Sequence, residues 1–278
     1  MKFLNRLILA LQRSDDLQGQ LMTFLRSPGE EFPMLSGKTL SREEARALVQ
    51  ELIPARIEMR GVCGRSLAVV AAAPHVSFDN WSEYFCNRVA QRYRLGWVVA
   101  KNYRDQDPHT IPAAIGRHIH VNRPTESAGP GRIERTTERA QDIHRLYVQA
   151  LAEASGRGAL PLDLLIEFHA HHRTPYLEVA TQGVERELAE QIAGWYAGMR
   201  GKLPMLPEMA IEPLHAIRMT AENTKQTGSL RSDVTRRALH IEIPRGSRRS
   251  DMGRRAMCKA LFKVTEELLK TLSAKAAA

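Results

Sequence analysis

Two apolar segments of this chain each end in histidine. SLAVVAAAPH closes on His75, and LPLDLLIEFHAHH carries His169, His171 and His172. A short apolar run between polar segments is typical of a buried strand in a helix-covered sheet, and the carboxyl ends of such strands face the crevice in which ligands bind. The sequence therefore predicts that imidazoles from two strand ends meet at one edge of a sheet.

Carboxylates follow the first histidine in VSFDNWSEYF. Imidazole nitrogens and carboxylate oxygens are the ligands that catalytic zinc uses, so Asp79 and His75 are candidates to share one ion. Asp79 also stands where the chain enters a helix and could cap it. Glu83 lies one turn further on the same face, where it could replace Asp79 as ligand or pair with Arg88.

The third ligand is expected from HAHH. In an extended strand His169 and His171 point to the same face, whereas His172 points to the other. We favour His169, which directly follows the apolar run, and keep His171 as the alternative. Glu167 shares the face of His169 and could orient its ring, although pairing with an arginine is the simpler interpretation.

Two further strand ends offer groups that a hydrolase needs. Asn122 and Arg123 follow a buried strand in VNRP, and a guanidinium there could grip a substrate carboxylate through two parallel hydrogen bonds or form a structural salt bridge. Glu242 lies inside the core strand LHIEIPR, on the face of His240 and Pro244. A carboxylate there is costly without a partner or a function. Near a metal, it would take a proton from water and pass it to the leaving nitrogen.

Strands and helices alternate along the chain and position these residues. In the first half of the chain, we expect helices within 1–27 and over 41–53, a strand over 66–73, a helix at DNWSEYFCNRVAQRYR, strands over 96–102 and 117–124, and a loop at TESAGPGR. A helix over 134–155 follows, with Ile143, Leu146, Tyr147, Ala150 and Leu151 on its apolar side. We then expect strands at the His169 segment and at YLEVATQG, a helix over 183–200, a continued alternation through LHAIRMT and ALHIEIP (238–244), and a last helix with Met257, Leu261, Val264, Leu268 and Leu272 inward. The pattern predicts an α/β fold: a three-layer sandwich with a mixed, mostly parallel central sheet flanked by helices. Residues 1–60 are expected to form a helical N-terminal extension that covers the site, docks a partner or builds a homo-oligomer contact, and residues 61–278 to form the α/β domain that carries the candidate site.

The composition excludes several classes of protein. The chain has 278 residues, of which 43% are hydrophobic, enough for one large folded domain. No apolar run approaches the roughly 20 residues that cross a bilayer, and the opening segment, interrupted by Arg6, lacks a cleavage pattern, so we expect a soluble cytoplasmic protein that does not enter membranes. Cys63, Cys86 and Cys258 are odd in number and scattered, which predicts buried thiols rather than a disulfide framework.

The formal net charge of +9 raises the question of a nucleic-acid partner. Much of the excess lies in the arginine-rich stretch RGSRRSDMGRR, residues 245–255, which contains no aromatic residue on which a base could stack. A solvated loop and helix start, or a surface that attracts anionic substrates, explains this stretch at least as well. Nucleic-acid binding is therefore the minority interpretation.

Five motifs, in order, complete the pattern: PHVSFDNWSEYF, HIHVNRP, DIHRLYVQAL, LLIEFHAH and ALHIEIPR. Over roughly residues 66–250 they resemble those of N-formylglutamate amidohydrolases and the related poly-gamma-glutamate hydrolases, which share a zinc-carboxypeptidase-like fold. The resemblance implies zinc (Zn²⁺) held by His75, an acidic residue after it and His169, with Arg123 gripping a carboxylate and Glu242 as general acid and base. Glu167 stands where the family has Asp.

The expected function is therefore a metal-dependent amidohydrolase that acts on a small anionic substrate, such as an N-acyl amino acid or a gamma-glutamyl compound. The alternative is a non-catalytic member of this fold that serves as a basic binding module for nucleic acid or a protein partner.

Overall fold

A computed structural model describes residues 32–33, 39–41, 56–60, 67–76, 79–101, 119–128 and 133–277. In the N-terminal part it shows β1 (Phe32–Pro33) and β2 (Thr39–Leu40), which pair antiparallel. The helices expected within 1–27 and over 41–53, and Cys63, lie outside the described residues. No helix among those described is long and apolar enough to cross a membrane.

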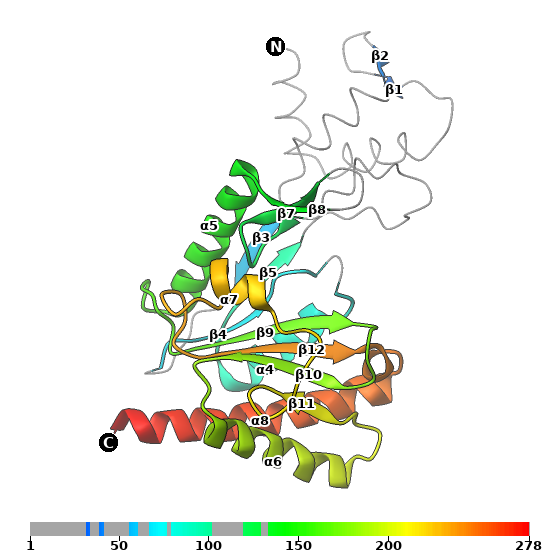
Figure 1. The fold of residues 1–278 in the computed structure, drawn as a ribbon, viewed down its shortest axis with the longest axis vertical. Coiled ribbons are helices and arrows are strands. Elements are labelled where there is room, and N and C mark those ends of the chain that lie inside the picture. Colours follow the sequence, from blue (N-terminus) through cyan, green and yellow to red (C-terminus); the bar gives the residue numbers. More distant parts are fainter. Residues whose placement is uncertain are drawn as a thin grey trace.

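A seven-stranded mixed sheet forms the middle layer (Figure 1). Its strand order is β11-β10-β12-β9-β4-β5-β3, and all neighbours are parallel except β10 with β12 and β3 with β5. The strands are β3 (Arg56–Arg60), β4 (Val69–Ala73), β5 (Gly96–Lys101), β9 (Leu164–His171), β10 (Leu177–Gln182), β11 (Met209–Ile211) and β12 (Ala238–Pro244). The predicted α/β class and mostly parallel sheet are confirmed, and the sheet already begins at β3, before residue 61.

Helices cover both faces of the sheet. α4 (Ser82–Tyr93), α6 (Arg186–Lys202) and α8 (Asp251–Ala277) pack on one face, and α5 (Glu138–Ala154) packs on the other (Figure 1). Strands β4 and β9 are neighbours at the centre, but the chain leaves β4 through α4 on one face and reaches β9 from α5 on the opposite face. The crevice outside the carboxyl ends of two such strands is where open α/β sheets bind ligands. The fold therefore brings the segment after β4 and the end of β9 to the expected site.

The two strands that carry most of the candidate residues have one apolar and one polar face. Ile166 and Phe168 of β9, with Leu239, Ile241 and Ile243 of β12, join the core under α4, α6 and α8. On the other face, parallel register places His240 beside Glu167, Glu242 beside His169 and Pro244 beside His171. All of these polar residues are buried. The period of two seen in LLIEFHAH and ALHIEIP thus separates a hydrophobic core from a buried polar layer.

A small three-stranded sheet corrects the predicted loop. β6 (Ile119–His120), β7 (Thr125–Ala128) and β8 (Ile133–Thr136) pair antiparallel in that order. The expectation that TESAGPGR forms a loop is therefore wrong for residues 125–128. The same sheet shortens the helix expected over 134–155, because α5 begins only at Glu138, where the hydroxyl oxygen of Thr137 accepts a hydrogen bond from the backbone N–H of Ala140.

Three other expectations about helices and strands are wrong in detail. Of the strand expected over 117–124, the described part contains only β6, because residues 121–124 form a turn. Leu146 is 54% exposed, so it does not belong to the apolar side of α5. LHAIRMT contains no strand, and the edge strand β11 lies just before it. By contrast, the five residues named for the inner side of the last helix, α8, are all buried. The short helix α7 (Glu222–Thr227) and the 3-10 helix η1 (Arg245–Arg248) complete the part of the fold around the site.

Candidate metal centre

The two histidines that end the apolar runs meet at the carboxyl edge of β4 and β9. The ring centroids of His75 and His169 are 4.9 Å apart with an interplanar angle of 66°. Both rings are buried, and the backbone N–H of Val76 donates to the carbonyl of Ala100 at the end of the neighbouring strand, which holds the chain after His75 in place. The convergence of imidazoles that are distant in sequence is thus present.

Asp79 lies between the two rings. Its Oδ2 atom is 3.6 Å from Nδ1 of His75 and 3.1 Å from Nδ1 of His169. Ligand atoms bound tetrahedrally at zinc with bonds of about 2.0–2.1 Å are about 3.3 Å apart, so these spacings fit one ion. α4 has no side-chain cap at its N-cap residue, Trp81. The carboxylate of Asp79 contacts the two imidazoles, and the main-chain carbonyl of Asp79 accepts a hydrogen bond from the N–H of Ser82 at the start of α4.

The two alternative ligands lie outside this group. Candidate ligand atoms of His75, Asp79 and His169 all lie within 4.8 Å of one another, and neither Glu83 nor His171 belongs to a donor group in the described part of the chain. Glu83 is half-buried in the first turn of α4. The Nε2 atom of His171 donates to the carbonyl of Tyr176 at 3.2 Å.

Glu167 lies next to His169 on β9, and several separate segments of the chain contribute its hydrogen-bond partners. It is fully buried, and its Oε2 atom is 3.5 Å from Nε2 of His169 and 3.3 Å from Nδ1 of His240. The hydroxyl of Tyr147 donates to Oε1 at 3.0 Å, and that of Ser229 does so at 2.6 Å. The pairing with an arginine that we preferred from the sequence is thus not what the structure shows. A carboxylate on the second nitrogen of a metal-binding histidine fixes the orientation of its ring and increases its basicity.

Charge alternates through the buried polar layer. Burial would raise the pKa of Asp79, but hydrogen bonds with His169 and His75 hold that pKa well below its usual range. Burial would lower the pKa of His169, but hydrogen bonds with Asp79 and Glu167 raise it to about 10. The pKa of Glu167 is likewise held well below its usual range, against burial, by His169 and His240. Without a metal, an imidazolium therefore sits between two carboxylates.

A second group of donors, Glu167, His169 and His240, also lies close enough to hold an ion. The rings of His169 and His240 are stacked, with centroids 3.9 Å apart and an interplanar angle of 26°. Ring lone pairs lie in the ring planes, so nearly parallel stacked rings direct them side by side instead of toward one point. The oxygens of Glu167 are also occupied by neutral donors. The group of His75, Asp79 and His169 therefore fits a metal ion better.

Glu242 stands beside this group. It is 5% exposed, pairs in register with His169 across the β9–β12 ladder, and its Oε1 atom is 3.3 Å from Nε2 of His240. Burial would raise its pKa, but the hydrogen bond with His240 and the charge of His169 lower it. Glu242 is therefore ionised at neutral pH and able to accept a proton.

Asn122 and Arg123 approach the site from the turn after β6. The Nδ2 atom of Asn122 donates to Oε2 of Glu167 at 3.3 Å, which leaves its buried Oδ1 without a partner among the described residues. A Cβ atom on Gly228 would lie 2.2 Å from the Asn122 carbonyl oxygen, so glycine is required for this close approach. The guanidinium of Arg123 binds Glu134 through Nε at 2.5 Å and Nη2 at 3.1 Å. One edge of its fork is thus already occupied.

Comparisons with known proteins add a likeness of fold. No protein-family model and no curated protein matches the chain. Among solved structures, a gene product of Agrobacterium tumefaciens is similar with a TM-score of 0.47 and 10% identity, covering 79% of this chain and 96% of the other. A bacteriophage poly-gamma-glutamate hydrolase is similar with a TM-score of 0.46 and 10% identity, covering 79% of this chain and 91% of the other. A metallo-carboxypeptidase from Burkholderia cenocepacia is similar with a TM-score of 0.39 and 15% identity, covering 83% of this chain and 70% of the other. Such scores and identities are too low to transfer a function.

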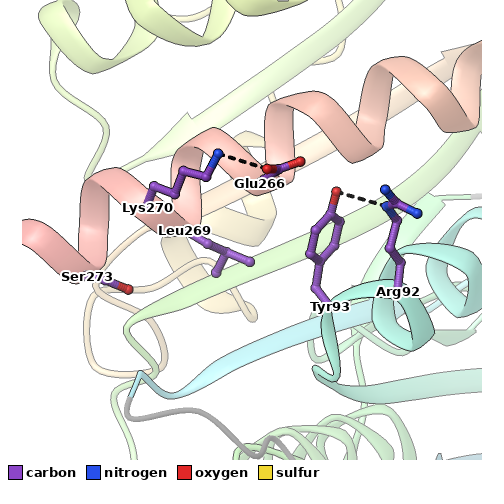
Figure 2. Close-up of a pocket in the computed structure, with 6 residues that line it drawn as sticks. All are labelled: Arg92, Tyr93, Glu266, Leu269, Lys270 and Ser273. Carbon is purple, nitrogen blue, oxygen red and sulfur yellow. Dashed lines mark hydrogen bonds and ion pairs between the residues drawn. The ribbon is translucent and has the colours of Figure 1, made fainter.

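A pocket lies away from these residues. Figure 2 shows this pocket between α4 and α8, lined by Arg92, Tyr93, Glu266, Leu269, Lys270 and Ser273. Its volume is about 650 Å³. It is at the end of α4 remote from Asp79, roughly 16 Å along the helix axis. Lys270 is paired with Glu266 at 2.8 Å, and the pocket contains none of the candidate donors. It is therefore not part of the metal centre.

Several residues of the site were not identified from the sequence. Tyr147 and Ser229 bind Glu167, and the ring of His120 lies edge-on to His75 with centroids 5.8 Å apart. Tyr147 carried a signal, because a tyrosine on the buried side of a helix needs a partner for its hydroxyl. His120 lay within the recognised motif HIHVNRP, whereas Ser229 had no signal that we can name.

Proposed function

We propose that this protein is a zinc-dependent hydrolase that cleaves an amide C–N bond in a small carboxylate-bearing substrate, of the N-formylglutamate, N-acyl amino acid or gamma-glutamyl type. Zinc would be held by His75, Asp79 and His169. The observation that carries the proposal is the position of Asp79 Oδ2, 3.6 and 3.1 Å from the Nδ1 atoms of the two histidines. The order of the five motifs supports the choice of an amide substrate.

When bound in such a site, zinc supplies Lewis acidity that polarises a carbonyl and acidifies water. The chain supplies the remaining chemistry through Glu242, which is buried, ionised and next to His169. Glu242 accepts a proton as a water oxygen bonds to the scissile carbon, and it delivers that proton to the nitrogen as the C–N bond breaks. The products are a carboxylic acid and an amine, and no covalent intermediate with the protein is formed.

Substrate recognition is assigned to Asn122 and Arg123. Glu134 is bound by the Nε and Nη2 atoms of Arg123. A substrate carboxylate would therefore bind the other edge of the guanidinium, which carries Nη1 and the second N–H of Nη2. The pair with Glu134 holds the guanidinium in a fixed orientation for that purpose. The unfilled Oδ1 atom of Asn122 would accept a hydrogen bond from an N–H group of the substrate.

The proposal is tested by metal content and by hydrolysis. Protein purified without affinity nickel should contain about one equivalent of zinc, and His75→Ala and His169→Ala should each lose it while remaining folded by circular dichroism. Glu242→Gln should keep its zinc but lose about 10²–10⁴-fold in kcat on N-formylglutamate or a gamma-glutamyl peptide. Zinc retained in both histidine variants would refute the ligand assignment. Full activity of Glu242→Gln would refute its role.

A further inference from the structure

The arginine-rich stretch 245–255 is only partly a surface. Arg245, Arg249 and Arg255 are exposed, but Arg248 is only 9% exposed. Arg248 ends η1, which directly follows β12, the strand that carries Glu242. A buried guanidinium is costly unless its N–H groups are satisfied, so its partners indicate what it does.

Arg248 binds three main-chain carbonyls from three separate segments. Its Nε atom donates to Ile243 at 3.1 Å, Nη1 to Asn80 at 2.9 Å and Nη2 to His171 at 2.8 Å. Each acceptor is close in sequence to a site residue: Ile243 follows Glu242, Asn80 follows Asp79, and His171 is two residues after His169. One planar group therefore sets the spacing of the three segments.

A second arginine supports the first. Arg254, in the first turns of α8, donates from Nη1 to the carbonyl of Arg248 at 2.6 Å and also pairs with Asp251. Its guanidinium carbon lies 3.7 Å from the ring centroid of Trp81, two residues after Asp79. Trp81 has a φ of 76°, a conformation that a bulky L-residue adopts only when its surroundings enforce it. The loop that carries Asp79 is thus held by both arginines.

We propose that Arg248 is a positioning residue of the metal centre, which holds the loop of Asp79, the end of β9 and the end of β12 at the separation that zinc requires. This inference rests on the proposed function. The planar guanidinium directs donors along three edges, whereas a lysine ammonium is a single point on a flexible stem and cannot reach all three carbonyls. The positive charge of Arg248 also acts on Asp79 and Glu242 and offsets part of the negative charge of the buried carboxylates.

The test is the zinc affinity of the full chain, measured by competition with a chromophoric chelator. Arg248→Lys should weaken zinc binding about 10–100-fold, the range seen when groups that orient metal ligands are removed. Arg249→Lys, at the exposed neighbour, should bind as the wild type does. Leu261→Ala, on the buried side of α8, controls for lost stability, because it should lower Tm without changing zinc affinity.

The outcomes separate this inference from the proposed function. If the wild type binds no zinc, the proposed function fails. If the wild type binds zinc and Arg248→Lys binds it equally well, or if Leu261→Ala loses as much affinity, only the role of Arg248 fails. If Arg248→Lys does not fold, Arg254→Gln is the second variant. It keeps the three hydrogen bonds of Arg248 and removes the bond from the Arg254 guanidinium to the carbonyl of Arg248. It should weaken zinc binding by a smaller factor, and unchanged affinity would overturn the inference.

Discussion

Replacing Glu167 with glutamine tests whether the buried polar layer depends on this one carboxylate. The amide oxygen can keep the hydrogen bonds from Tyr147 and Ser229, which reach Oε1. The amide nitrogen, however, would replace Oε2, which accepts from Asn122 and faces His169 and His240. That amide nitrogen would then face the N–H donor of Asn122 and the two ring nitrogens, and the negative charge between two imidazoles would be lost.

The expected cost follows from burial. Removing one partner of a buried charged pair costs about 3–5 kcal/mol. Glu178→Gln is a matched control, because this glutamate is 3% exposed but accepts only from neutral groups, the hydroxyl of Thr174 and the backbone N–H groups of Arg218 and Met219. An amide oxygen can retain part of that pattern, so we expect a loss of about 1–2 kcal/mol there.

The assay is urea unfolding of both variants, followed by circular dichroism at pH 7 after treatment with a chelator. Chelation removes any contribution of metal binding to the free energy of unfolding. Glu167→Gln should lose about 1–4 kcal/mol more than Glu178→Gln, given the costs of buried unpaired donors and charges. Equal losses for the two variants would show that the imidazoles do not need the charge of Glu167, and the reasoning would be refuted.

Three further predictions concern single groups. The pKa of His169 is raised from 6.5 to about 10, so the charge of its ring stabilises the metal-free protein fully below pH 6.5, and this stabilisation is lost as the pH rises through about 10. In urea titrations, the free energy of unfolding of the wild type, relative to that of His169→Gln, should therefore fall between pH 6.5 and about 10. Cys86 and Cys258 are buried with raised pKa values, so neither should react with a thiol reagent at pH 8 until the protein is unfolded, and rapid labelling of the folded chain at either position would contradict their burial. Arg123→Lys should raise KM on the proposed substrate about 10–100-fold with zinc content unchanged, since lysine cannot form two parallel bonds; an unchanged KM in steady-state kinetics would remove Arg123 from substrate binding.

Strand periodicity accounts for what could be predicted from the sequence. In LLIEFHAH and ALHIEIP, the alternation of apolar and polar residues indicates both the strands and the shared face of Glu167 and His169. The apolar runs also place His75 and His169 at strand ends, and parallel strands bring those ends to one edge of the sheet. Asp79 follows from its distance to His75 along the chain. These inferences all use local patterns.

The remaining parts of the site depend on contacts between distant segments. Tyr147 reaches Glu167 from α5, and Ser229 reaches it from the segment after α7, through packing that no local pattern encodes. Arg248 looked like one charge of a basic surface because burial of an arginine is decided by carbonyls contributed from elsewhere in the chain. Strand β7 was missed for a similar reason, since TESA has little β-propensity and is held by pairing with its neighbours.

The burial of so many ionisable groups on one face of β9 and β12 and in the adjoining loop of Asp79 argues for function over stability. Apolar residues of similar volume would pack there without the cost of removing charges from water, and such replacements are often neutral or stabilising. Here Asp79, His169, Glu167, His240 and Glu242 instead alternate as acid, imidazole, acid, imidazole and acid, with contacts of 3.1–3.5 Å. Each member shares a hydrogen-bond partner with the next, so the energetic effects of single substitutions are coupled and will not add. The hydrogen bonds of this layer also hold Asp79 and His169, two of the three donors that could bind a metal ion, in fixed positions.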